Sequence, residues 1–67
     1  MKTLADRIKG LRLARGLTIA QAVKELQMSP STLYKYELWM VRPKLDILCR
    51  IIKFYDVTSD YLLGLND

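Results

Sequence analysis

Apolar residues recur at spacings of three and four along most of the chain, which is the pattern of short amphipathic helices. Thr3 and Asp6 form a capping-box pair that predicts the start of a first helix, and Gly16 marks its end. The apolar residues of this helix share one face: Leu4, Ile8 and Leu11.

Two further helices follow at short distances. Thr18 and Gln21 form a second capping box, and Ser29 followed by Pro30 has the order of an N-cap and a first helical residue. The third helix is expected to run to about Glu37. The apolar residues of the second and third helices are Ala22, Val23, Leu26 and Leu33.

The remainder of the chain predicts a fourth helix after Pro43, ending near Asp56, and a short fifth one capped by Thr58 and stopped by Gly64. No segment alternates apolar and polar residues as a strand does. We therefore predict an all-α, compact bundle of five short helices that forms a single domain over residues 1–67. Its expected core is Ile8, Leu11, Leu17, Val23, Leu26, Leu33, Leu48, Ile51, Tyr55 and Leu62.

Composition narrows the function classes. The 67 residues are 51% hydrophobic and 27% charged, which excludes a disordered chain, and no apolar run is long enough for a membrane span. The absence of histidine and the single cysteine argue against a metal site, a cofactor and an enzyme. That cysteine, Cys49, is expected to be a small buried residue of the fourth helix. One cysteine and no signal peptide predict a cytoplasmic protein.

The second and third helices, each of about eight residues and joined at residues 27–29, have the dimensions of a helix-turn-helix. From about residue 4 to residue 64, the chain resembles the Cro/phage-repressor-like (XRE-type) helix-turn-helix family. The resemblance rests on Arg12, residues 16–18, Leu26, residues 29–37, Arg42, Pro43, Val57 and residues 60–64.

The resemblance implies a lambda-repressor-like DNA-binding fold whose third helix enters the major groove. It also implies a structural ion pair between Arg12 and Glu37. The residues that it assigns to DNA contacts include Thr18, Pro30, Ser31, Tyr34 and Lys35. If DNA is bound, three cations are expected at the rim of the contact: Lys35, Arg42 and Lys44.

Several residues on the side that faces DNA in this family depart from its pattern toward apolar side chains. Ile19 stands where the family usually has a glutamine, and Trp39 stands where the turn after the third helix usually has a glycine. In addition, Gln27 replaces the glycine that is usual in the turn of the helix-turn-helix. Leu38, Met40 and Val41 extend the apolar run around Trp39. The departures predict an exposed apolar patch centred on Trp39. Its expected members are Ile19, Pro30, Tyr34, Leu38, Trp39, Met40 and Ile47.

Two functional hypotheses follow. Because the charged residues of segment 18–41 sum to zero, the leading hypothesis is a protein-binding module, natural or engineered, that binds a protein partner or a second copy through the apolar patch. The alternative is a sequence-specific DNA-binding transcriptional repressor. If Trp39 is an exposed contact residue, Trp39→Gly should leave folding intact or improve it.

Overall fold

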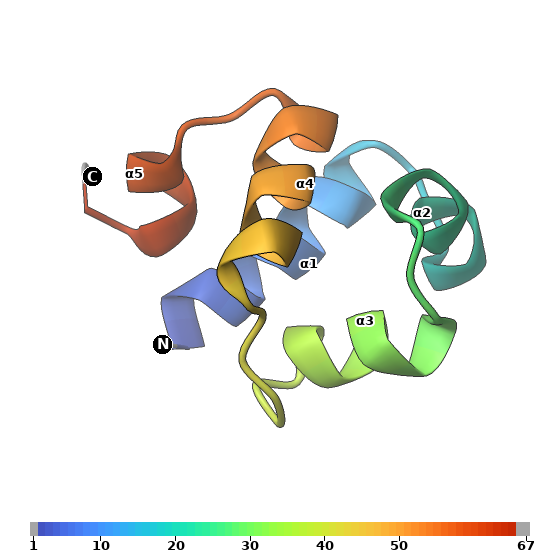
Figure 1. The fold of residues 1–67 in the computed structure, drawn as a ribbon. Coiled ribbons are helices and arrows are strands. Elements are labelled where there is room, and N and C mark those ends of the chain that lie inside the picture. Colours follow the sequence, from blue (N-terminus) through green and yellow to red (C-terminus); the bar gives the residue numbers. More distant parts are fainter. Residues whose placement is uncertain (1, 66–67) are drawn as a thin grey trace.

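Within residues 2–65, which the computed structural model describes, the chain forms five α-helices joined by short connections (Figure 1). This arrangement confirms the predicted all-α fold. The helices are α1 (Lys2–Ala14), α2 (Ile19–Leu26), α3 (Pro30–Glu37), α4 (Leu45–Tyr55) and α5 (Ser59–Leu63).

Side-chain caps start three of these helices where the sequence predicts. Thr18 Oγ1 accepts the Gln21 amide at 3.1 Å, and Gln21 Oε1 accepts the Thr18 amide at 2.8 Å, which completes a capping box at α2. Ser29 Oγ accepts the Thr32 amide at 3.2 Å at the start of α3. Thr58 caps α5 in the same way. Each cap thereby satisfies part of the amides that have no acceptor within the helix.

The predicted capping box at Thr3 and Asp6 is wrong. Thr3 lies inside α1, which begins at Lys2, and its methyl group packs against Gly64 just after α5. A Cβ atom on residue 64 would lie 2.8 Å from Thr3 Cγ2, and Gly64 has φ 74°. Both the close contact and the left-handed backbone therefore require glycine at the point where α5 ends against the start of α1.

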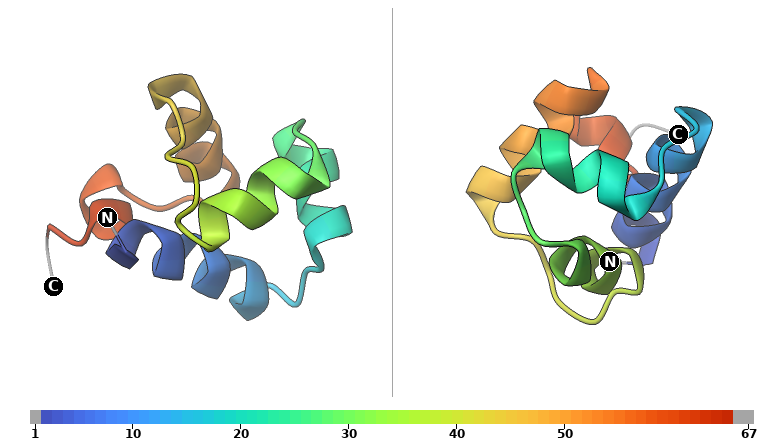
Figure 2. Two further views of the ribbon diagram at one scale, coloured as in Figure 1. Left: turned by 90° about the horizontal axis from the view of Figure 1, so that it is seen from below. Right: turned by 90° about the vertical axis from the view of Figure 1, so that its right-hand side faces the viewer.

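The core draws one large, fully buried side chain from each helix. These five are Ile8, Leu26, Leu33, Ile51 and Leu62. Val23 and Tyr55 are buried as predicted, whereas three other predicted core residues are only partly buried: Leu11, Leu17 and Leu48. Buried positions outside the predicted set are Leu4, Ala5, Ala22, Tyr36, Glu37 and Pro43. In Figure 2, α5 lies beside the start of α1, and α2 lies beyond the other end of α1. The first helix therefore spans the length of the domain.

Arginine side chains connect the helices to one another. Each of four arginines donates to a backbone carbonyl of another element. Three of these carbonyls lie at the C-terminal ends of α2, α4 and α5. At such an end the carbonyls have no acceptor role within the helix, and a positive charge is favourable. The bonds are Arg7 to Tyr61 O (2.7 Å), Arg12 to Leu17 O (2.8 Å), Arg15 to Tyr55 O (3.0 Å) and Arg50 to Gln27 O (3.4 Å).

None of the helices within residues 2–65 has both the length and the apolar character needed to cross a membrane.

Candidate nucleic-acid interface

A three-residue turn, residues 27–29, sets α3 against α2. Gln27 adopts a left-handed backbone with φ 57°, and the Met28 amide donates back to Val23 O at 3.3 Å. A left-handed residue of this kind, most often glycine, commonly ends a helix, and here Gln27 adopts that backbone in place of the usual glycine. With Leu26 and Leu33 buried on either side of the turn, α2 and α3 form one helix-turn-helix unit.

The outer surface of α3 carries a row of exposed side chains. Leu33, Tyr36 and Glu37 are buried, so the opposite face of the helix points to solvent. The exposed residues at spacings of three and four are Ser31, Tyr34, Lys35 and Leu38, which we call the outer stripe. Pro30 is exposed at the start of the helix.

An ion pair holds the end of α3 in place. Arg12 Nε and Nη2 donate to Glu37 Oε2 and Oε1 at 2.8 and 3.0 Å, and the two side chains are only 11% and 4% exposed. The Glu37 hydrogen bond raises the pKa of Arg12, against the opposing effect of burial. Because Arg12 also binds the carbonyl of Leu17, it fixes α3 against both α1 and the connection to α2. The structural pair that the resemblance implied is confirmed.

The ion pair also changes the charge of the surface around α3. Glu37 contributes to the zero sum of segment 18–41 but is buried against Arg12, so that sum does not describe the exposed side chains. Over residues 18–44, one carboxylate, Glu25, is exposed. The exposed cations of the same segment are Lys24, Lys35, Arg42 and Lys44. The exposed side chains of this segment therefore carry a net positive charge.

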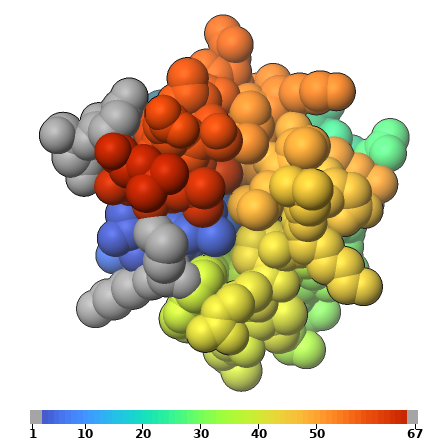
Figure 3. All heavy atoms as spheres, turned by 60° about the vertical axis from the view of Figure 1, so that its left-hand side comes forward, coloured from blue at the N-terminus to red at the C-terminus, as the bar shows by residue number. Residues whose placement is uncertain are grey.

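The connection after α3 turns sharply at Trp39, which has φ 60°. The Met40 amide donates to Lys35 O at 2.9 Å, and the Arg42 guanidinium carbon lies 4.9 Å from the centre of the indole ring. The positive φ confirms the backbone expected from the usual glycine at this position. Figure 3 shows this connection as a projection at one end of the face formed by α4 and α5.

The apolar patch predicted around Trp39 is only partly present. Trp39, Ile19 and Ile47 are partly buried and pack against the hydrophobic core, so the prediction of an exposed Trp39 at the centre of the patch is wrong. Part of the indole surface is covered by the core, and the Arg42 guanidinium lies over the ring, so little of Trp39 is left for a partner. The exposed members of the predicted set are Pro30, Tyr34, Leu38 and Met40.

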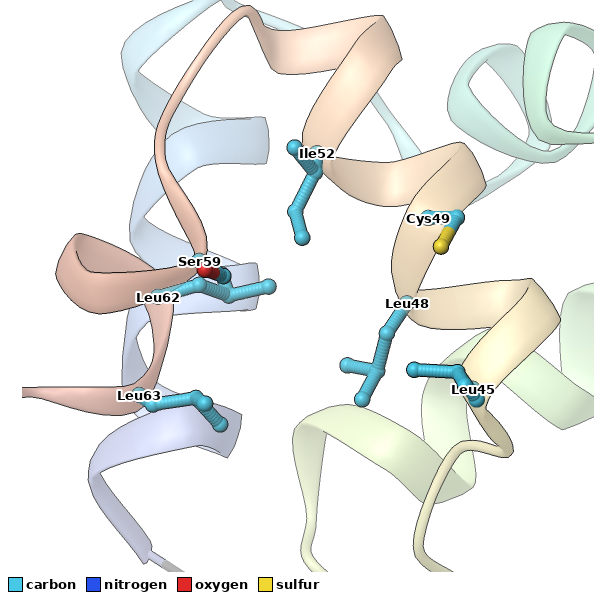
Figure 4. Close-up of a pocket in the computed structure, with 7 residues that line it drawn as sticks. All are labelled: Leu45, Leu48, Cys49, Ile52, Ser59, Leu62 and Leu63. Carbon is cyan, nitrogen blue, oxygen red and sulfur yellow. The ribbon is translucent and has the colours of Figure 1, made fainter.

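A second surface feature lies on α4 and α5. An apolar pocket of about 370 Å³ is lined by Leu45, Leu48, Cys49, Ile52, Ser59, Leu62 and Leu63 (Figure 4). Cys49 is exposed, so the prediction that it is buried is wrong. Ile51 and Tyr55 take the inward positions of α4, whereas Cys49 shares an outer face with Lys53.

Among residues 2–65, no cluster of three His, Cys, Asp or Glu side chains could hold a metal ion.

Comparison with known proteins adds a family to this geometry. The profile of the helix-turn-helix domain matches residues 3–63. The chain is 38% identical over 62 residues to the uncharacterized HTH-type transcriptional regulator YobD of Bacillus subtilis (strain 168), covering 92% of this chain and 55% of that protein. It is 34% identical over 62 residues to the HTH-type transcriptional regulator ImmR of the same organism, covering 92% of this chain and 49% of that protein.

The chain thus spans about half the length of these two relatives. No solved structure gives a significant match. The match to a helix-turn-helix domain and the names of both relatives agree with the expectation that the chain is not an enzyme. With nearly the whole chain matched, a helix-turn-helix unit in place and the outer face of α3 exposed, this protein belongs to the helix-turn-helix domain family.

Proposed function

We propose that this chain is the DNA-binding domain of a transcriptional regulator and that α3 enters the major groove of duplex DNA. The carrying observation is the outer stripe on α3, which is exposed on a helix that a buried ion pair holds in place and which belongs to a segment whose exposed side chains carry a net positive charge. An α-helix fits the major groove, and cations near it supply the affinity for phosphates.

The relatives favour this function over the protein-binding hypothesis, because both are named as transcriptional regulators. Nothing in the comparisons supports an engineered binder. The physical argument for a protein interface also weakens, since Trp39 was to supply the centre of the apolar patch and it packs on the core instead. We therefore assign the exposed members of that patch to the DNA side: Pro30, Tyr34, Leu38 and Met40.

The start of α2 is suited to a backbone phosphate. Its capping box occupies the amides of Thr18 and Gln21, whereas the amides of Ile19 and Ala20, in the first turn of the helix, have no acceptor within it. Such amides, together with the positive end of the helix dipole, bind anions. The missing polar side chain at Ile19 thus removes one contact but leaves the backbone donors.

The cations beyond α3 would hold the flanking phosphates. Lys35 lies on the outer stripe, and Arg42 and Lys44 follow in the connection to α4. Each phosphate contact that is neutralised releases about one counterion, so binding should weaken steeply as salt is added. This role accords with the predicted cytoplasmic location, which stays a prediction.

The test is fluorescence anisotropy of the chain with a random-sequence duplex and with duplexes enriched from a library, over a series of salt concentrations. Arg42→Ala and Lys44→Ala should each weaken binding to every duplex and lower the salt slope by about 1. The matched control is Lys53→Ala, since Lys53 lies in the last turn of α4, the end of that helix farther from α3 in Figure 1.

The control variant should bind like the parent. If the parent chain binds no duplex even at low salt, or if its binding is insensitive to salt, the proposed function is wrong.

A further inference from the structure

The chemistry of the outer stripe is unusually restricted for a surface that reads DNA. Its side chains are a hydroxyl, a phenol, an ammonium group and an isobutyl group, from Ser31, Tyr34, Lys35 and Leu38. Within α3, no arginine, asparagine or glutamine is present, and its one carboxylate, Glu37, is buried against Arg12. The stripe therefore has no side chain for the two-bond recognition of adenine and no acceptor for the cytosine amino group.

What the stripe does offer matches two other features of the major groove. The thymine methyl group is the apolar feature of the base edges, and the guanine N7 and O6 atoms are acceptors that lysine can bind. Tyr34 and Leu38 are 56% and 50% exposed and lie one helical turn apart. Lys35 is exposed on the same side, between them along the helix.

We propose that α3 selects its DNA site through thymine methyl groups, contacted by Tyr34 and Leu38, and through one guanine, contacted by Lys35. This inference rests on the proposed function and adds the class of sequence that is bound. Four residues of α-helix rise about 6 Å, which corresponds to roughly two base-pair steps of B-DNA. The two thymines should therefore be about two steps apart, with the guanine close to them.

The carboxyl end of the stripe supports an apolar contact there. Leu38 continues the helical backbone as the C-cap of α3, and the sharp turn at Trp39 follows it directly. Trp39 packs inward at this turn, whereas Leu38 does not. The helix thus ends with an aliphatic side chain facing the same side as Tyr34 and Lys35, at a point where a polar or basic residue would otherwise extend the phosphate contacts.

The experiment uses a duplex enriched by the parent chain from a random library. In this duplex, each thymine is replaced in turn by uracil, which removes only the methyl group, and each guanine by 7-deazaguanine, which removes only the N7 acceptor. At two thymines, the uracil duplex should bind the parent about fourfold more weakly, as expected for loss of one buried methyl group. At one guanine, 7-deazaguanine should weaken binding tenfold or more.

The assignment of side chains comes from repeating the measurement on variants. In Tyr34→Ala and Leu38→Ala, one uracil effect each should disappear, and in Lys35→Ala the 7-deazaguanine effect should disappear. Leu13→Ala is the matched control, because Leu13 is a leucine on α1 with an exposed fraction (56%) close to that of Leu38 (50%), and it should keep every base effect. Circular dichroism of each variant checks that it is folded.

The outcomes separate the two proposals. If the chain binds no DNA, the proposed function fails and this inference fails with it. If the chain binds DNA but enriches no site, or binds a site whose affinity uracil does not change, the inference is wrong while the proposed function stands. The same holds if the uracil effects persist in both Tyr34→Ala and Leu38→Ala.

Discussion

The left-handed backbone at Trp39 leads to a stability prediction in which alanine and glycine must differ. The indole packs partly against the core and lies beside Arg42, and both Trp39→Ala and Trp39→Gly remove these contacts. A tryptophan buries about 150–250 Å² when fully enclosed, so at ~25 cal/mol per Å² its partial burial here is worth roughly 2–4 kcal/mol. Both variants should therefore be less stable than the parent.

The two variants differ in the backbone term. Alanine retains a Cβ atom at φ 60°, which costs about 1–2 kcal/mol relative to glycine. Trp39→Gly should therefore be more stable than Trp39→Ala by about 1 kcal/mol, and less stable than the parent. This expectation replaces the one drawn from an exposed tryptophan, in which glycine leaves stability intact or improves it.

Urea unfolding followed by far-UV circular dichroism measures these differences, since both variants lack the only tryptophan. Met40→Ala and Met40→Gly are the matched control pair, because Met40 is 66% exposed and does not have a positive φ. There the order should reverse, with glycine the less stable variant. Equal midpoints for the two Trp39 variants would refute the backbone term, and parent-like stability of either would refute the packing of the indole.

Three other substitutions test separate features of the fold. Gly10→Ala should stabilise the chain by about 0.5–1 kcal/mol in urea unfolding, because Gly10 lies within α1 and an added Cβ meets nothing within 4 Å; lower stability would contradict the open space there. Glu37→Gln should cost about 3–5 kcal/mol, since it leaves the guanidinium of Arg12 buried without its charged partner, and a thermal midpoint close to the parent's would show that the pair is dispensable. Burial is the main cause that raises the pKa of Tyr55, so the unfolded chain loses this proton first, and stability should fall as the pH rises above its ordinary pKa of 10.0. Tyr55→Phe removes a buried hydroxyl that has no hydrogen-bond partner among residues 2–65, so it should raise stability by about 1 kcal/mol at neutral pH. The variant should also lose less stability than the parent at alkaline pH. A steeper loss in the variant would contradict the role given to the Tyr55 hydroxyl.

The sequence was sufficient for the helices whose ends depend on local chemistry. The capping box of Thr18 and Gln21 and the Ser29–Pro30 start of α3 involve contacts over only a few residues, and the structure confirms both. The same pattern failed at Thr3, which lies inside α1 and has its methyl group close to Gly64, a residue distant in sequence. A capping pattern alone therefore did not fix the residue at which this helix begins.

The candidate site was harder to predict, because exposure depends on how the chain turns after α3. The positive φ at Trp39 could be predicted from the glycine that is usual in the family, but the direction of the indole could not. That direction decides whether the apolar patch has an exposed centre. The charge sum was misleading for a similar reason, since Glu37 is cancelled by a residue 25 positions earlier. The sequence did contain the information needed to correct this sum. The resemblance already implied that Glu37 pairs with Arg12, so Glu37 could have been left out when the surface charge was counted.

The arginine contacts between helices have a consequence for chemical modification of the protein. Four guanidinium groups bind backbone carbonyls, whereas three of the four exposed cations over residues 18–44 are lysines. Acetylation neutralises a lysine and leaves arginine unchanged. An acetylating reagent or enzyme would therefore remove positive charge from the surface around α3 while the contacts that hold the helices together stay intact. Affinity for a polyanion could then be lowered in steps on a domain that keeps its fold.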